Sequence, residues 1–377
     1  MTSLGNVEVT PLASLTFINF VTGDILYITG EAKTLVGAEA EALMRRQKVL
    51  TTVTTTGYTF VRDALPLRQD PNVPVARSPY SPPVKFLVEE TPSASGHYFE
   101  DTHVLLTKID LLSQDLAVFR FEIQGAAVEI SPGQSVALDF TDFVGPQEYA
   151  HMNPWKPTSL NDDRIRTWTV SSAHVDGKTR TFELTMREKP GGLVTGALFS
   201  IARKLRESMP RVMEDCRILS MVVRLVGVAG DFVLPPVQDS TMGRNKLLFV
   251  AGGIGITPFL SMLKAIRERG EERDVVLLIS TREPKVLLNL VADAISQPSA
   301  KLKLVVHVFS SQEIPDLDTD AELKKHPSRI SRSFWINDLK DVKEREVYLC
   351  GPPEFNKAIQ EHSGLEANRI HSEGFNY

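Results

Sequence analysis

A long apolar run followed by glycines constrains the fold of this 377-residue chain more than any other feature. Residues 247–251 are all apolar, and three glycines follow them before Thr257 and Pro258. Such a run predicts a strand buried on both faces, and the proline fits the first turn of a helix. Glycines let the backbone approach a pyrophosphate, and the N–H groups at a helix start favour an anion. The segment therefore predicts a phosphate-binding turn with Thr257 as the helix cap, and a turn without a ligand is the alternative.

The rest of the chain after residue 245 repeats this alternation of apolar strands and helices. Strands are expected at residues 247–251, 275–280, 302–309 and 346–350, and helices at residues 258–269, 287–296 and 353–362. Apolar strands that alternate with helices predict a parallel sheet covered on both faces. Ligands of such sheets bind at the carboxyl ends of the strands, so we expect the site there.

Residues 97–236 follow a different pattern, in which short β-prone segments alternate with turn residues. Strands are expected at residues 102–110, 116–123, 135–140, 166–172 and 181–187, and one helix at residues 195–208. Pro132 with Gly133 and Asp176 with Gly177 mark two of the turns. This pattern predicts a β-barrel or a sandwich.

The N-terminal part is short and rich in β-prone residues. Strands are expected at residues 14–20, 25–29 and 49–60, a helix at residues 31–46, and an extended proline-rich linker at residues 66–98. The expected domains are a β segment at residues 1–65, this linker, a barrel at residues 99–240 and an α/β domain at residues 241–377. Two or three strands make a thin core, so we expect the first segment to be unstable alone.

Composition excludes several classes of protein. The net charge is −5 and no stretch is rich in Lys or Arg, which argues against nucleic acid as a partner. The two cysteines, Cys216 and Cys350, exclude a disulfide framework and a four-cysteine iron–sulfur cluster in this chain. The histidines lack metal-ligand spacing, so no metal site is expected. The N-terminus has no secretory pattern, and glycines and a proline interrupt the apolar residues 247–263. We therefore expect a cytoplasmic protein without a membrane span.

One further candidate binding segment lies at the end of an expected strand. Cys350 precedes Gly351 and Pro352, which turn the chain sharply away. This order places Cys350 at the carboxyl end of the sheet, facing the crevice. A buried core cysteine, which is the usual position of a free thiol, is the alternative.

Two more candidate segments lie in the barrel half. Residues alternate along a strand, so Arg166 and Trp168 are expected on one face and Thr167 and Thr169 on the other. Arginine clamps phosphate and an aromatic ring stacks on a planar cofactor, whereas a surface arginine with a core tryptophan is the alternative. The second segment, residues 191–195, has two glycines before an expected helix, which suits either a phosphate cradle or a plain loop.

In their order along the chain, these segments resemble the ferredoxin–NADP reductase-like family, in which a flavin-binding barrel precedes a nicotinamide-nucleotide domain. Four family motifs are similar to residues 166–169, 191–195, 252–258 and 350–353, and the family's C-terminal Glu-x-aromatic element is similar to residues 373–375, with Tyr377 as the last residue. The resemblance covers residues 99–377. It implies an α/β plus β-barrel fold, with a six-stranded antiparallel Greek-key flavin barrel followed by a parallel-sheet nucleotide-binding domain.

The resemblance also implies a role for individual residues. Arg166 would hold a flavin phosphate, Trp168 would stack on the flavin, and Thr169 would hydrogen-bond near flavin N5. Cys350 would lie beside the nicotinamide, and Glu373 would help to close the site. Catalytic roles are therefore expected for Thr169, Cys350 and Glu373 in a flavin-dependent NAD(P)H oxidoreductase that binds FAD. The other residues expected to bind cofactors are Thr167, Gly191, Gly192, Leu193, Val194, Thr195, Gly252, Gly253, Gly255, Thr257, Pro258, Arg282, Arg329, Gly351, Pro352, Phe375 and Tyr377.

Two arginines decide which nicotinamide cofactor is expected. Arg282 follows the expected strand at residues 275–280, where the family meets the adenosine ribose. Arg329 lies in a segment similar to a Gly-Arg-Ile/Leu element of the family, without its glycine. An arginine there fits a 2′-phosphate, so NADPH is expected and NADH is the alternative. For both arginines a solvated surface position is the other interpretation.

The electron acceptor is expected to be a separate haem protein or a small molecule, because two cysteines cannot supply an attached iron–sulfur domain. A role in secondary metabolism is open. The alternative class is a catalytically weak protein that binds flavin or nucleotide and retains the fold. Residues 22–30 and 64–67 resemble the tail of a pyridoxamine-phosphate-oxidase-like split barrel, which predicts a partial barrel at the N-terminus.

Overall fold

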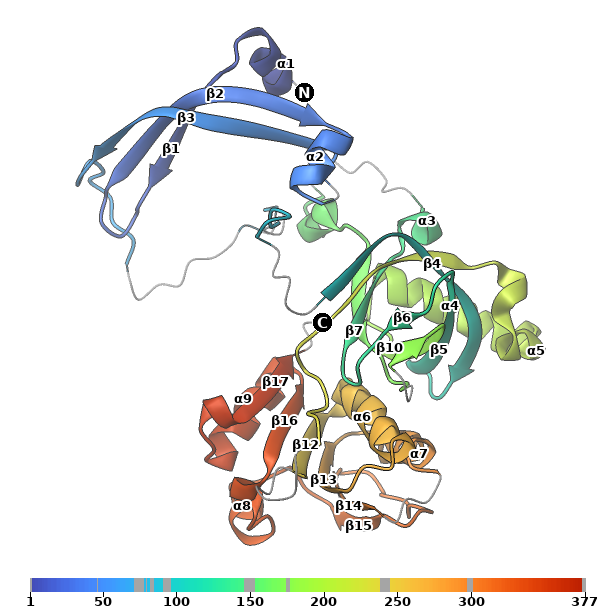
Figure 1. Ribbon diagram of the computed structural model, residues 1–377. Helices are drawn as coiled ribbons and strands as arrows, with labels where there is room; N and C mark the ends of the chain where they lie inside the picture. Colours follow the sequence, from blue (N-terminus) through green and yellow to red (C-terminus); the bar gives the residue numbers. More distant parts are fainter. Residues whose placement is uncertain are drawn as a thin grey trace. The chain divides into compact units, whose positions relative to one another are not determined.

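The chain forms two compact units (Figure 1). The computed structural model describes residues 2–45, 47–70, 78, 80–81, 85–90, 96–145, 153–173, 177–237, 245–296 and 301–374. Unit 1 comprises Met1–Ala94 and Tyr149–Asp162, and unit 2 comprises Ser95–Glu148 and Asp163–Tyr377. The expected barrel and the expected α/β domain both lie in unit 2. The domain boundaries expected from the sequence stay predictions.

Unit 1 contains an antiparallel sheet in the order β1-β2-β3. Its elements are α1 (Thr2–Val9), β1 (Leu12–Ile18), β2 (Ile25–Val36), α2 (Ala38–Leu43), β3 (Val49–Val61) and a 3₁₀ turn at Pro157–Asn161. The expected helix at residues 31–46 is wrong in its first half, because residues 31–36 continue β2. Leu35 pairs with Leu50 and Val36 with Val49 across to β3. These cross-strand pairs outweigh the helix propensity of the neighbouring Ala and Glu residues.

The first part of unit 2 is a six-stranded antiparallel sheet in the order β10-β5-β4-β11-β7-β8. Its strands are β4 (Gly96–Leu111), β5 (Leu116–Gln124), β7 (Ser135–Asp139), β8 (Ile165–Thr169), β10 (Thr181–Arg187) and β11 (Val222–Ala229). The edge strands β8 and β10 meet, since the Ser171 N–H just after β8 donates to the Glu183 carbonyl of β10 at 2.9 Å. The predicted six-stranded barrel is therefore confirmed. A separate two-stranded ladder joins β6 (Val128–Glu129) to β9 (Lys178–Thr179).

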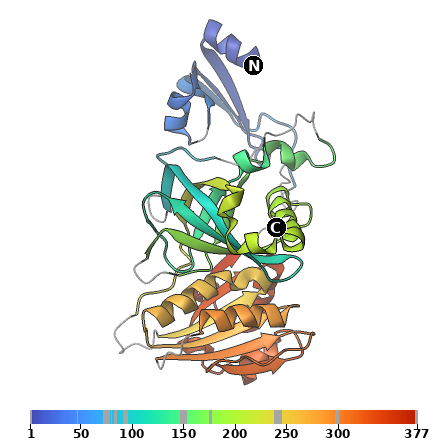
Figure 2. The ribbon, with the colours of Figure 1, turned by 90° about the vertical axis from the view of Figure 1, so that its right-hand side faces the viewer.

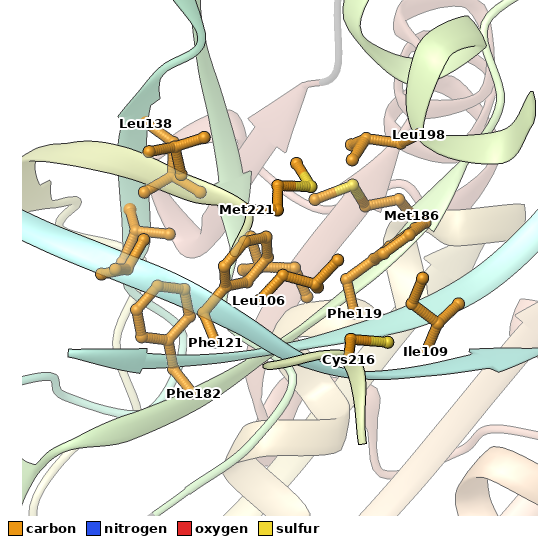
Figure 3. Packing of buried hydrophobic residues seen from close by; sticks show 14 of the residues in the cluster. Leu106, Ile109, Phe119, Phe121, Leu138, Phe182, Met186, Leu198, Cys216 and Met221 are labelled. Carbon is orange, nitrogen blue, oxygen red and sulfur yellow. The ribbon is translucent and has the colours of Figure 1, made fainter. Parts of the chain in front are cut away.

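Large apolar side chains fill the barrel (Figure 3). Phe121 stacks on Phe182 with ring centroids 5.6 Å apart, and both rings are buried. Leu198, from α4, packs into the same cluster. Cys216 is fully buried there as well, and burial raises the pKa of its thiol to about 11. The remaining elements of this part are α3 (Thr141–Val144), α4 (Leu193–Ser208), α5 (Pro210–Glu214) and a 3₁₀ turn at Cys216–Leu219.

Strand β11, which the sequence analysis missed, lies near the middle of the barrel sheet. It pairs with β4 on one side and β7 on the other, and both ladders shift register between Leu225 and Gly227. A bulge of this kind interrupts the two-residue alternation by which a strand is recognised in a sequence. The alternating pattern of β11 is therefore broken, and the sequence analysis did not identify it as a strand.

The second part of unit 2 is a six-stranded parallel sheet in the order β15-β14-β13-β12-β16-β17. Its strands are β12 (Lys246–Gly252), β13 (Arg273–Ser280), β14 (Leu302–Phe309), β15 (Glu322–His326), β16 (Glu346–Gly351) and β17 (Ile370–Gly374). The predicted parallel sheet is confirmed, whereas the edge strands β15 and β17 were missed. Both are short and mostly polar, because an edge strand does not need two apolar faces.

Helices cover both faces of this sheet. The helices are α6 (Thr257–Glu268), α7 (Pro284–Ala294), α8 (Arg332–Asn337) and α9 (Pro353–Ser363), with 3₁₀ turns at Gly253–Ile256, Val342–Glu344 and Ala367–Arg369. Leu247 and Phe249 pack with residues of α6 and α7, and Leu248 and Val250 pack with residues of α8 and α9. Figure 2 shows α6 and α7 lying across one face. In the described part of the chain, no helix is long and apolar enough to cross a membrane.

Candidate functional site

The turn after β12 is packed directly against the end of β16. A Cβ atom at Gly255 would lie 2.2 Å from the carbonyl oxygen of Cys350, so only glycine fits this position. A Cβ atom at Gly252 would lie 2.6 Å from the ring of Phe355. These contacts bring the glycine turn and the Cys350–Gly351 segment together, as expected for two motifs at the carboxyl ends of adjacent parallel strands.

A 3₁₀ turn at Gly253–Ile256 separates β12 from α6. Thr257 is the first residue of the helix and is buried, while Ile256 takes the cap position without a side-chain hydrogen bond. The prediction that Thr257 caps the helix is therefore wrong, because the extra turn moves the cap back by one residue. Pro258 does lie in the first turn. Gly253 has φ +56° and open space around its Cα, so the backbone of this turn is accessible at that point.

Cys350 and Glu373 are direct neighbours across the ladder between β16 and β17. The Cys350 side chain is fully buried in the apolar cluster beneath α6 and α7, so it does not face an open crevice. Burial, with a smaller contribution from the nearby Glu373, raises the pKa of the Cys350 thiol. Burial also raises the pKa of Glu373, and among the described residues its Oε2 atom has no hydrogen-bond partner. Both side chains therefore favour their protonated, neutral forms.

Asn356, which the sequence analysis missed, fixes Glu373 from the opposite side of the sheet. Its Nδ2 donates to the Glu373 carbonyl oxygen at 2.9 Å, and its own N–H donates to the Pro352 carbonyl at 3.0 Å. Asn356 is buried in the first turn of α9. The sequence offers one weak sign of this role: Asn356 is a polar residue in the first turn of a helix that follows two prolines.

The expected flavin signature occupies β8, the strand next to β7. Trp168 is half-buried and packs edge-on against Phe140, with centroids 5.6 Å apart and planes at 81°. Arg166 is half-buried, Thr167 is exposed, and Thr169 is buried with its Oγ1 accepting a hydrogen bond from Ser135 Oγ at 3.3 Å. The Thr169 hydroxyl keeps its own proton to donate elsewhere.

The second glycine segment forms the start of α4. The Lys189 N–H donates to Thr195 Oγ1 at 3.1 Å, and a Cβ atom at Gly192 would lie 2.7 Å from that hydroxyl. Gly191 has φ +68° and open space beside it. Helical hydrogen bonding begins with the Gly196 N–H donating to Gly192, so the N–H groups of residues 193–195 precede the first helical bond. The first helical hydrogen bond therefore does not use the N–H groups of residues 193–195.

A buried contact joins the barrel to the parallel sheet within unit 2. The Gly133 N–H donates to Ser261 Oγ of α6 at 2.9 Å. Gly133 has φ +100°, and a Cβ atom there would lie 2.1 Å from the Phe232 carbonyl oxygen. Two residues later, Ser135 bonds to Thr169. Thr169 is thereby linked through the Pro132–Gly133 turn and α6 to the glycine turn that touches Cys350.

A second polar contact joins the two parts near Arg282. Arg187, at the end of β10, pairs with Glu283 and, at 2.5 Å, with Asp115. Arg282 itself is exposed, and so is Arg329 after β15. Phe375 and Tyr377, expected at the C-terminal end of the site, lie outside the described residues.

Comparisons with known proteins agree with this architecture. A family model described as an oxidoreductase NAD-binding domain matches residues 249–361. The FAD/NAD-binding domain of a nitric oxide dioxygenase from Vibrio cholerae aligns with a TM-score of 0.50 and 17% identity, covering 74% of this chain and 99% of that domain. Unit 2 therefore has the fold of a FAD/NAD-binding reductase domain, and residues 249–361 match the oxidoreductase NAD-binding model. The resemblance inferred from the five sequence segments is confirmed by the fold of unit 2 and by the NAD-binding match.

Among curated proteins, this reductase-like module is similar to parts of longer chains. The flavohemoprotein of Candida albicans is 31% identical over 213 residues, which is 56% of this chain and 46% of that protein. The reductase subunit of stachydrine N-demethylase from Rhizobium meliloti is 26% identical over 265 residues, covering 69% of this chain and 63% of that protein. The chain spans about half the length of the curated relatives it matches.

Proposed function

We propose that this chain is an NAD(P)H-dependent flavin oxidoreductase that binds FAD and NADPH and passes electrons to a separate acceptor. One observation carries the proposal. The flavin-signature strand β8 and the Cys350–Glu373 pair are joined by a continuous set of contacts through Ser135, Gly133 and α6. Hydride transfer needs two rings held together at reacting distance, and a rigid junction between two cofactor-binding parts meets that need.

The residues of the barrel fit a flavin dinucleotide. The loop at residues 191–195 offers backbone N–H groups for the pyrophosphate, and the open space at Gly191 leaves room for close approach. Arg166 would add a charged contact to phosphate, and Trp168 would supply a ring face. When bound there, FAD would supply a hydride acceptor that can release electrons singly or in pairs.

The residues at the junction would hold the two rings and exclude water. The Thr169 hydroxyl, held by Ser135, would donate a hydrogen bond near flavin N5. Cys350 stays a neutral, fully buried thiol because burial raises its pKa, so it would be no nucleophile and would support the strand end beneath the nicotinamide. A protonated Glu373 carboxyl can donate a hydrogen bond toward the same region.

The nicotinamide nucleotide would bind across the turn at residues 252–258. The backbone at Gly253 is open, and the start of α6 favours a pyrophosphate. Arg282 follows β13 and Arg329 follows β15, with β14 between these two strands; both side chains are exposed cations, and a 2′-phosphate would pair with them. These two side chains support NADPH over NADH.

The acceptor proposed is a separate haem protein or a small molecule. The matched relatives include flavohemoproteins, a reductase subunit and an electron transfer component of toluate 1,2-dioxygenase. Reduction of cytochrome c or ferricyanide, but not of quinones, would support a protein acceptor. Reduction of quinones alone would support a small-molecule acceptor.

The visible spectrum tests the proposed activity. The purified full chain, incubated with FAD and freed of excess, should be yellow and should bleach when NADPH is added without oxygen. A colourless protein, or a bound flavin that neither NADPH nor NADH bleaches, contradicts the proposal. Bleaching that takes many minutes would favour a binding protein that has kept the fold.

A pair of threonine variants sharpens this test. Thr169→Val should keep FAD and slow bleaching by about 100-fold, because a positioned hydrogen-bond donor at a reacting centre contributes about that much. Thr181→Val, on β10 of the same barrel, should bleach like the unaltered protein. Equal rates for all three proteins would remove Thr169 from the chemistry.

A further inference from the structure

The sheet of unit 1 carries a continuous apolar surface at the end formed by the β1–β2 hairpin. It consists of two rows of side chains, and each row runs across all three strands β1, β2 and β3. The first row is Phe17, Leu26 and Phe60, and the second is Leu15, Ile28 and Tyr58. Directly paired residues share a face, as do residues two apart on a strand, so all six lie on one face. We call this surface the aromatic face.

The three aromatic side chains of this face are largely uncovered. Phe17 is 53% exposed, Phe60 51% and Tyr58 75%, and Leu15 beside them is 39% exposed. None of the six residues is charged. The next row on the opposite face differs, since it places Tyr27 between Thr16 and Thr59. Large aromatic residues at three neighbouring positions are therefore a property of one face only.

The described helices of unit 1 lie at the other end of the sheet. Helix α2 starts two residues after β2 ends at Val36, which is about 26 Å along the strand from Ile28. The Ala32 N–H at that far end donates to Pro11, which follows α1. A sheet must bury an apolar face against a second layer to be stable. Among the described residues of unit 1, no helix or strand supplies that layer over the aromatic face.

We propose that the aromatic face is the contact surface between two copies of this chain. At about 150–250 Å² per aromatic side chain, the exposed parts of Phe17, Tyr58 and Phe60 leave roughly 350 Å² uncovered, and Leu15, Leu26 and Ile28 extend this surface. That area falls within the range of the largest apolar patch on a typical monomer, and such a patch is often functional. Two such faces together remove roughly 1,000 Å² from water, which reaches the size of a specific interface.

The absence of charge within the six residues favours a second copy over a partner of different chemistry. In a two-fold symmetric interface each residue meets a copy of its own patch, so like charges would face each other and repel. An uncharged, flat, aromatic surface meets its own copy without that penalty. A partner selected by charge would instead leave complementary charged residues in the patch.

Oligomeric state as a function of concentration tests the proposal on the full chain. Sedimentation velocity should show a dimer that dissociates on dilution. The variant with Phe17→Ser and Phe60→Ser should be monomeric, with an unchanged far-ultraviolet circular dichroism spectrum. The matched control Tyr27→Ser, on the opposite face, should still dimerise. A monomeric unaltered protein at all concentrations, or a dimer that survives the double substitution, overturns the proposal.

Cross-linking decides the matter even if the double variant does not fold. Both native cysteines are buried, so a single introduced thiol reacts selectively. Tyr58→Cys should give a covalent dimer with a short bismaleimide, because the two thiols approach across the two-fold axis. Thr59→Cys, on the other face of the same strand, should not. Equal cross-linking of the two variants, or none of Tyr58→Cys, overturns the proposal.

Discussion

The two glycine segments of unit 2 look alike in sequence and differ in their packing. The turn at residues 252–258 is wedged against β16, and Gly255 has a backbone oxygen where a Cβ would be. In the loop at residues 191–195, Gly191 has open space and Gly192 meets mainly the side chain of Thr195. The first segment therefore needs glycine to let two strand ends touch, whereas at Gly191 the second needs it for a positive φ and not for lack of space. Glycine is thus required at Gly255 because a Cβ has no room, and at Gly191 because of the backbone conformation.

Gly255→Ala should have the largest effect, and it tests whether the turn at residues 252–258 is packed against β16. Its Cβ would overlap the Cys350 carbonyl oxygen, and neither backbone segment can move away freely. We expect a loss of about 3 kcal/mol in the free energy of unfolding, measured by urea denaturation, and loss of NADPH-dependent bleaching. Gly253→Ala, which meets only an unfavourable φ, should cost about 1 kcal/mol. Equal costs for the two would show that the turn is not held by β16.

Arg187→Met tests whether the two segments are coupled through the barrel. Arg187 is the last residue of β10, four residues before the loop at residues 191–195, and it pairs with Glu283 next to Arg282. Removing it takes the cation away from two half-buried carboxylates, Asp115 and Glu283, and leaves negative charge beside Arg282. We therefore expect a loss of about 2 kcal/mol in NADPH affinity, measured by titration calorimetry. The double variant with Glu283→Gln should recover most of that loss. No recovery would assign the effect to general destabilisation.

Gly192→Ala should have a moderate effect confined to the open loop. The added methyl group meets the Thr195 hydroxyl, which can rotate away, and the Lys189 carbonyl at 3.0 Å. We expect a loss of about 1 kcal/mol in the free energy of unfolding and weaker retention of FAD on gel filtration. A loss as large as that of Gly255→Ala would show that both segments are packed alike.

Glu373→Gln should have the smallest effect, and the effect should depend on pH. Burial raises the pKa of Glu373 in the folded protein, so the carboxyl is neutral at low pH and its ionisation opposes folding as pH rises through the folded pKa. The variant should therefore match the unaltered protein at about pH 4 and be more stable by up to about 1 kcal/mol at about pH 8. Urea denaturation at both pH values measures this. Glu354→Gln, exposed on α9, should show no such difference.

Much of the fold follows from local sequence patterns. Apolar runs such as residues 247–251 identified the parallel strands, because a strand buried on both faces is apolar at every position. Strands that need only one apolar face, such as β15 and β17, or that contain a bulge, such as β11, were missed. The helix expected at residues 31–46 was wrong over residues 31–36, because pairing with β3 overrode local propensity there.

The candidate site was predicted as separate motifs rather than as a geometry. The sequence analysis placed Cys350 and Glu373 in one site from the family resemblance, but it did not pair them across a ladder. It also missed Asn356 and Ser261, whose contacts join segments far apart in the chain. Such contacts depend on strand order and register, which no local pattern encodes.

By itself, the sequence determined which segments are strands and helices along most of unit 2 and in what order the cofactor motifs occur. It did so because burial on one or both faces leaves a period in the residues nearby. Only the tertiary structure decided that Cys350 is buried beside Glu373, that Gly255 has no room for a side chain, and that six apolar residues of unit 1 share one uncovered face. Each of these results from strands distant in sequence lying side by side, and long-range pairing is settled by the packing of the whole fold.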